Sequence, residues 1–206
     1  VFAALTSGDN NVALGTNALN DNTTGSLNTA VGAFSLDSNT TASNNTALGS
    51  SALGQNTTGA SNTAVGTSAL TANTTASNNV AVGKNAMLNT TTGHSNVAIG
   101  DGALDANTTG TVNVAVGKDA LGSSTTQSAN TAIGYGALRD NTSGSANTGL
   151  GYLALEENTT GSYNIAVGVE ALEENTQGTG NIAIGYQALE ENTTASYNTA
   201  IGYETL

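Results

Sequence analysis

The sequence contains no Cys, no Pro and no Trp in 206 residues, and Lys plus Arg number only 3. Without Cys, neither a disulfide framework nor a Cys-ligated zinc or iron–sulfur centre can form. Against 15 acidic residues, the few basic ones leave a net charge of −12, which cannot neutralise nucleic acid phosphates. The same charge is repelled by an anionic lipid surface, and no apolar run approaches the ~20 residues that span a bilayer. We therefore expect neither nucleic acid binding nor membrane insertion.

What the chain does contain is one repeat of seventeen residues. Gly recurs at every seventeenth position from Gly15 to Gly202, and Asn does the same from Asn11 to Asn198, without an insertion or deletion. The consensus is N-(T/V/I)-A-(V/I/L)-G-x-x-A-L-x-x-N-T-T-G-x-x, and its positions are numbered 1 to 17 from the first Asn. A fixed period indicates that each unit stacks on its neighbour in one geometry.

A parallel β-solenoid is the fold that this repeat predicts. Seventeen residues are too few for a helical pair, which needs about 33, and the unit has one Leu where a leucine-rich repeat has several. Positions 2 to 4 alternate as a strand does, positions 8 and 9 (A-L) form a second short edge, and N-T-T-G is a turn signal. We expect one all-β domain over residues 1–206, a β-roll or β-helix of about twelve coils with two short strands each, of either hand.

Stacking explains the invariant rows. Like residues of successive coils lie about 4.8 Å apart, so Asn side chains would hydrogen-bond to one another, Gly would form a corner with positive φ, and Leu with aliphatic residues such as Val31 and Val65 would fill a thin core. The residues expected to carry the structure are Asn62, Asn79, Asn96, Asn113, Gly66, Gly83, Gly100, Gly117, Leu70 and Leu104.

Position 3 is Ala in every coil except one, where it is Gly149. If the position 4 side chains point inward, this row points outward, and its uniform smallness indicates a closely packed partner surface. The alternative is that Ala faces a cramped interior and the β-branched row faces outward. The candidate interface residues are Ala64, Ala81, Ala98 and Ala115. Because three apolar residues per coil poorly offset an ordering entropy of about 1.5 kcal/mol per residue, we expect self-association, with a trimer favoured.

The repeat register runs into both ends, where Phe2 and Leu206 occupy the Leu row. Solenoids normally carry polar caps because a bare end is an open sheet edge. We expect an uncapped array that is a segment of a longer fibre, or whose subunits stack end to end into a filament.

Catalytic motifs are missing. His94, the one His, sits in a turn row of small residues and is expected at the surface. Neither a G-x-S-x-G elbow nor a complete phosphate loop nor the G-G-x-G-x-D calcium repeat occurs. We predict no enzyme activity, no cofactor and no metal centre.

Two outward features leave other functions open. Paired Glu residues recur on the same two rows at Glu156-Glu157, Glu173-Glu174 and Glu190-Glu191. They form either a solvated stripe or a set of carboxylates whose mutual repulsion bound cations would relieve. Tyr135, Tyr152, Tyr186 and Tyr203 share position 6 and either stack on a ligand such as a glycan or stabilise the sheet. Ice binding is the weaker match, because Thr23 and Thr24 are adjacent rather than two apart.

The strings NTAVGTSAL and NTAIGYGAL resemble the N-S-V-A-I-G-type repeats in the heads of trimeric autotransporter adhesins, which fold as trimeric left-handed parallel β-rolls. The whole unit is also similar to repeats of bacterial and phage fibre proteins, many of which end in an endosialidase-type chaperone domain. The period is longer than the adhesin one, and Asn precedes a β-branched residue where the adhesin has Ser-Val. The resemblance implies an extracellular, cell-surface or virion fibre or adhesin shaft with a cell-surface target. The rival hypotheses are a glycan- or ice-binding solenoid and a cation-stabilised rod.

Overall fold

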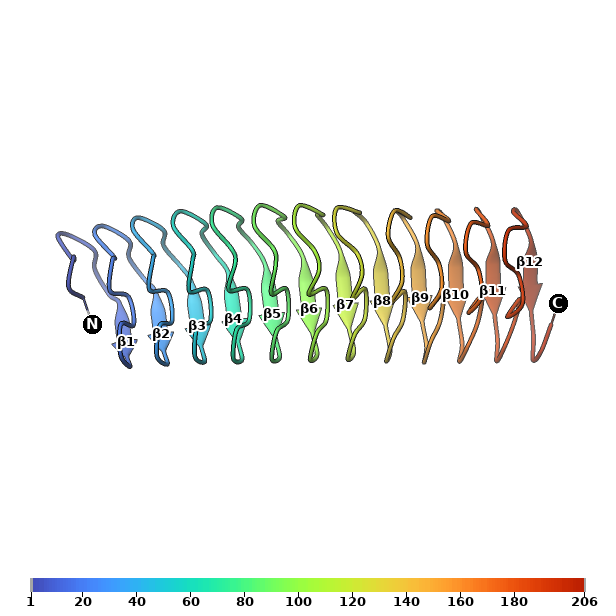
Figure 1. Cartoon of the computed structure of the whole chain (residues 1–206), viewed down its shortest axis with the longest axis horizontal. Helices are drawn as coiled ribbons and strands as arrows, with labels where there is room; N and C mark the ends of the chain where they lie inside the picture. Colours follow the sequence, from blue (N-terminus) through green and yellow to red (C-terminus); the bar gives the residue numbers. More distant parts are fainter. Residues whose placement is uncertain (1, 206) are drawn as a thin grey trace.

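The computed structural model describes residues 2–205, which form one straight rod of stacked coils (Figure 1). Twelve parallel strands form one sheet, and each strand pairs only with its neighbours in the sequence. Their bounds are β1 Val12–Leu14, β2 Thr29–Val31, β3 Thr46–Leu48, β4 Thr63–Val65, β5 Val80–Val82, β6 Val97–Ile99, β7 Val114–Val116, β8 Thr131–Ile133, β9 Thr148–Leu150, β10 Ile165–Val167, β11 Ile182–Ile184 and β12 Thr199–Ile201. The predicted parallel β-solenoid is confirmed. Over residues 2–205, no helix has the length and apolar character needed to cross a membrane.

Strict registration joins the coils. Every strand pairs with residues seventeen positions further along, so that Ala64 lies beside Ala81 and Val65 beside Val82. Each coil is bonded to both neighbours: the amide of Val97 donates to the carbonyl of Asn113 at 2.9 Å, and the amide of Gly100 donates to the carbonyl of Val82 at 2.8 Å. Identical residues therefore repeat along the rod at the spacing of a sheet.

Within the described range each coil has one strand, so the prediction of two short strands per coil is wrong. The A-L segment lies in a turn in which Leu adopts a left-handed backbone, with φ 54° at both Leu70 and Leu104. This conformation costs a non-Gly residue about 1–2 kcal/mol, but both Leu side chains are fully buried, which contributes about 1.5–3 kcal/mol each. The Leu amide still bonds the next coil, as Leu70 does to the carbonyl of Ala86 at 2.9 Å.

The core is a narrow column of small side chains. Positions 3, 8 and 9 fill it, represented in the fourth coil by Ala64, Ala69 and Leu70, all with 0% exposure. A Cβ placed on Gly149, at position 3, would already lie 2.9 Å from the carbonyl oxygen of Ala154. The interior therefore admits at most a methyl group at position 3.

This narrow interior corrects the sequence interpretation of the Ala row. The four candidate interface residues Ala64, Ala81, Ala98 and Ala115 are buried with 0% exposure, so they cannot contact another molecule. Conversely, the position 4 side chains that were expected in the core, such as Val31 and Val65, are partly exposed. The alternative that the sequence left open, with Ala inside and the β-branched residues outside, is the one observed.

Two Asn rows bond in different ways. At position 1, the side-chain oxygen of Asn79 accepts a hydrogen bond from the backbone amide of Asn96 at 2.9 Å, and its amide group donates to the carbonyl of Gly93 at 2.9 Å. The invariant row, including Asn62 and Asn113, is buried, but it mostly joins side chain to backbone rather than side chain to side chain. The ladder that we predicted there occurs at position 12 instead, where Asn56 donates to the side-chain oxygen of Asn39 at 2.9 Å.

The Gly corner at position 5 is confirmed. The φ values of Gly66, Gly83, Gly100 and Gly117 lie between 135° and 141°. A side chain is rarely compatible with this conformation, and the coils also approach closely there, because a Cβ on Gly117 would lie 2.2 Å from the carbonyl oxygen of Gly134.

Candidate functional surfaces

The outward side of the sheet is the most extensive candidate surface, and we call it the strand face. It consists of the side chains at positions 2 and 4 of strands β1 to β12, all of which are Thr, Val, Ile or Leu. Their exposure is high for aliphatic side chains, 41% for Ile99, 43% for Leu150 and 48% for Leu48. Apart from Asp9, every charged side chain of the repeats falls at positions 6, 7, 10 or 11. The rod therefore carries an uncharged, largely apolar strip along its whole length, and such strips mark interaction surfaces.

The Tyr row at position 6 points outward as predicted, and its rings are stacked in two pairs. The ring centroids of Tyr135 and Tyr152 lie 5.5 Å apart, and those of Tyr186 and Tyr203 lie 5.1 Å apart. Lys118 of the preceding coil places its ammonium group 5.7 Å from the centroid of Tyr135. Because the two rings of a pair cover each other, no ligand can stack between them.

A second set of tyrosines, which the sequence reasoning missed, lies at position 17. Tyr163 and Tyr197 are 69% and 82% exposed. The Tyr197 ring lies over Gly180 of the preceding coil, because a Cβ on Gly180 would be 2.9 Å from the ring. Positions 17 and 6 flank each strand on its two sides. The repeat numbering alone places Tyr163 and Tyr197 at the same position, so this row could have been found from the sequence.

At position 10, three glutamates occupy successive coils, Glu156, Glu173 and Glu190, and the coil before them carries Arg139. Arg139 places Nη1 2.5 Å from Oε1 of Glu156, whose side chain is only 8% exposed. The next member, Glu173, has no such partner. Burial, followed by repulsion from Glu170 and Glu156, raises the pKa of Glu173 to about 7. Desolvation and the charge of Glu170 also raise the pKa of Glu190.

Two carboxylates of this row converge with a third from position 7. One oxygen each from Glu170, Glu173 and Glu190 lies within 4.8 Å of the others, the one group of this kind found over residues 2–205. The Gln187 amide donates to Glu170 at 2.9 Å and to Glu190 at 3.1 Å, which offsets part of the repulsion. Carboxylate oxygens are ligands that Ca²⁺ accepts, so the arrangement is compatible with a loosely held cation.

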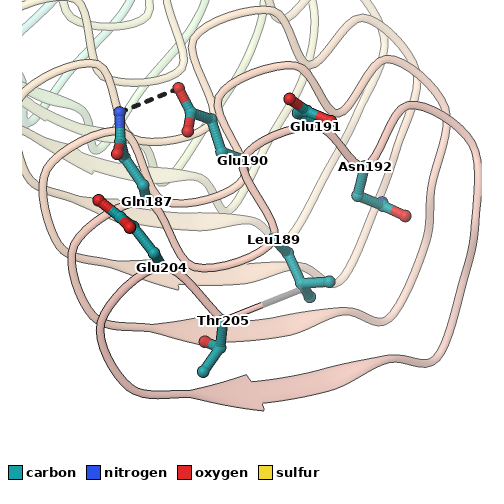
Figure 2. Close-up of a pocket in the computed structure, with 7 residues that line it drawn as sticks. All are labelled: Gln187, Leu189, Glu190, Glu191, Asn192, Glu204 and Thr205. Carbon is teal, nitrogen blue, oxygen red and sulfur yellow. Dashed lines mark hydrogen bonds between the residues drawn. The ribbon is translucent and has the colours of Figure 1, made fainter.

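A pocket lies next to this cluster, at the C-terminal end of the described residues (Figure 2). Its lining side chains are Gln187, Leu189, Glu190, Glu191, Asn192, Glu204 and Thr205. Leu189 belongs to the core row, and the following member of that row, Leu206, lies outside the described residues. The pocket therefore adjoins the last described member of the core row, and we assign it no binding function.

Two further sequence features have a structural explanation. His94 is exposed, with Nδ1 3.3 Å from Oγ of Ser95, as expected for a surface residue. The Thr row at position 13 uses its hydroxyl groups within the rod, since Oγ1 of Thr57 donates to the carbonyl of Thr74 at 2.8 Å. Position 14, represented by Thr58, is exposed. The turn therefore presents one free Thr column rather than the two that ice binding requires.

Neither known protein families, nor curated proteins, nor solved structures give a match to this chain.

Proposed function

We propose that this chain is the structural shaft of an extracellular fibre or adhesin, and that it works as a lateral homo-oligomer, with a trimer favoured. The observation that supports this function is the strand face, an exposed apolar strip that runs the length of the rod in strict register. A surface of this kind is unfavourable in water unless a partner covers it.

A second copy of the same chain is the partner that fits the strand face. It has the same coil spacing, so each row of one copy meets an equivalent row of the other along the entire rod. Twelve strands about 4.8 Å apart and three residues wide, at about 3.3 Å each, present on the order of 550 Å² before the flanking rows are counted. This approaches the ~800 Å² per partner of a stable interface. Because charged side chains lie off this face, two copies can approach without placing like charges in contact.

The assignment to a fibre or adhesin rests on the repeat. NTAVGTSAL-type strings resemble those of adhesin heads and phage fibres, and a rod with an uninterrupted core suits a stiff spacer. A surface location, on a cell or a virion, and a cell-surface target follow from that resemblance and are part of the proposal.

Self-association is tested by measuring the mass of the chain in solution by light scattering coupled to size exclusion. The parent protein should elute with three chain masses at micromolar concentration. A variant with Ile99→Lys and Ile133→Lys places two charges on the strand face and should shift the mass to one chain, while circular dichroism stays unchanged because both side chains are already exposed.

The matched control is Thr109→Lys with Ser143→Lys, which adds the same charge on the exposed turn row at position 14. This control should keep the parent mass. A parent protein that is monomeric at these concentrations, or a control that dissociates as readily as the strand-face variant, would contradict lateral assembly.

A cation-stabilised rod is the second candidate, supported by the carboxylates of Glu170, Glu173 and Glu190. If it is correct, millimolar Ca²⁺ should raise the melting temperature of the parent, and EDTA should reverse the rise. Glu170→Gln should remove this response without changing the solution mass, so this outcome is separable from the lateral-assembly test.

A further inference from the structure

The tyrosine row at position 6 has a gap. Tyr135 and Tyr152 form one stacked pair and Tyr186 and Tyr203 form the other, and the coil between the two pairs carries Val169 at the same position. Val169 is 39% exposed, so the rings on either side do not close over it. One ring face of Tyr152 and one of Tyr186 therefore have no aromatic neighbour.

The dimensions of this gap follow from the coil spacing. Tyr152 and Tyr186 are two coils apart, and two rises of ~4.8 Å separate their rings by about 10 Å. A flat aromatic ring in contact with both faces at ~3.5–4.0 Å would need only about 7–8 Å. The extra room matches a puckered, saturated six-membered ring that carries hydrogens on both faces.

Polar side chains at position 7 lie beside the gap. Position 7 places Glu170 next to Val169 and Gln187 next to Tyr186, and the Gln187 amide holds the Glu170 carboxylate at 2.9 Å. A fixed carboxylate accepts hydrogen bonds from hydroxyl or ammonium groups. Since Glu173 and Glu190 lie within 4.8 Å of the same carboxylate, an anionic ligand is repelled.

We propose that Tyr152, Val169 and Tyr186 form a binding site for a single pyranose ring of a neutral or amino sugar. The sugar ring lies over Val169 between the two tyrosine faces, and Glu170 accepts hydrogen bonds from its hydroxyl groups. Aromatic walls with a few fixed polar groups are the usual composition of small-ligand sites. The side chains of the proposed site lie at positions 6 and 7, beside the strand face rather than on it, so the site needs no side chain of the strand face.

The experiment titrates the intact chain with monosaccharides and follows the tyrosine and valine resonances by NMR. N-acetylglucosamine and glucosamine should bind with a Kd on the order of millimolar, as expected for one small ring, and glucuronic acid should bind at least ~10-fold more weakly. Val169→Tyr continues the stacked row already present in neighbouring coils, so it keeps the fold and fills the gap. It should weaken binding at least ~10-fold.

Matched variants locate the site. Tyr152→Ala and Tyr186→Ala each remove one wall and should weaken binding to a similar extent, whereas Tyr163→Ala, on the row at position 17, should leave it unchanged. The proposal is overturned if none of the sugars shifts these resonances up to tens of millimolar, if Val169→Tyr binds like the parent, or if Tyr163→Ala has the same effect as Tyr152→Ala. Equal affinity for glucuronic acid would overturn the role of Glu170.

Discussion

At the residue scale, the glycine corner is where a single side chain has the largest effect on stability. Gly117 has φ 137°, and a Cβ there would lie 2.2 Å from the carbonyl oxygen of Gly134 in the next coil. Gly117→Val should therefore lower the melting temperature by on the order of 10 °C, because neither the backbone conformation nor the space admits a side chain. Thermal unfolding followed by circular dichroism measures this change.

The control for this prediction is Gly54→Ala. Gly54 belongs to position 10, which carries a side chain in every other coil except that of Gly122, and its Cβ contacts would be no closer than 3.3 Å. Its melting temperature should stay within a few degrees of the parent. If Gly117→Val melted with the parent as well, the closely stacked corner would be wrong.

Glu173 gives the rod a dependence on pH. Its pKa is raised from 4.5 to about 7, so the folded state disfavours the charged form, and ionisation lowers stability progressively as the pH rises from about 4.5 to about 7. Glu173→Gln removes this penalty and should raise the melting temperature by a few degrees at pH 8, with no gain at pH 4, where the parent side chain is already neutral. The exposed neighbour Glu157→Gln is the control, and an equal gain from it at pH 8 would contradict a specific role for Glu173.

The sequence predicted which residues share a face but not which face is inside. Alternation along the strand places Ala64 on one side and Val65 on the other, and either side satisfies the pattern. The choice depends on the width of the coil, which is set by the turn at positions 6 to 11. Because the left-handed backbone at Leu70 has no signature in the residue types, the direction of the Ala row could not be derived beforehand.

At the scale of the structural element, the position 12 ladder is broken where Asn is replaced. Thr90 occupies this position in the fifth coil, and the buried side-chain oxygen of Asn73 has no hydrogen-bond partner. An unsatisfied buried acceptor costs about 1–3 kcal/mol. Thr90→Asn supplies the missing donor and should raise the melting temperature by a few degrees.

The second break serves as a contrast. Ser124 interrupts the ladder in the seventh coil and likewise leaves the buried side-chain oxygen of Asn107 without a partner, but there the Gln127 side chain occupies the turn, and its Oε1 accepts hydrogen bonds from the amides of Thr125 and Thr126, both at 2.9 Å. Ser124→Asn alone should therefore stabilise the rod less than Thr90→Asn, and combining it with Gln127→Gly should recover the gain. An unchanged or lower melting temperature for Thr90→Asn would mean that the ladder contributes nothing.

At the scale of the whole molecule, the residues that form the coils repeat evenly along the rod, whereas the Tyr and paired Glu residues at its surface do not. The Asn, Gly and Leu rows continue from one end to the other, whereas all six Tyr lie between residues 135 and 203 and the paired Glu lie between 156 and 191. This asymmetry was readable in the sequence, since it needs only the period. The stacked ring pairs were not, because their geometry depends on side-chain conformations.

The same nearest-neighbour architecture makes the rod tolerant of losing a whole coil. Each strand pairs only with its sequence neighbours, so deleting residues 62–78 joins Ser61 to Asn79 with every row still in register. This variant should fold cooperatively, and small-angle X-ray scattering should show a maximum dimension about 5 Å shorter than that of the parent. Deleting only residues 62–70 shifts all later rows off their counterparts and should abolish cooperative melting. If the two deletions behaved alike, registration of identical residues would not be what stabilises the rod.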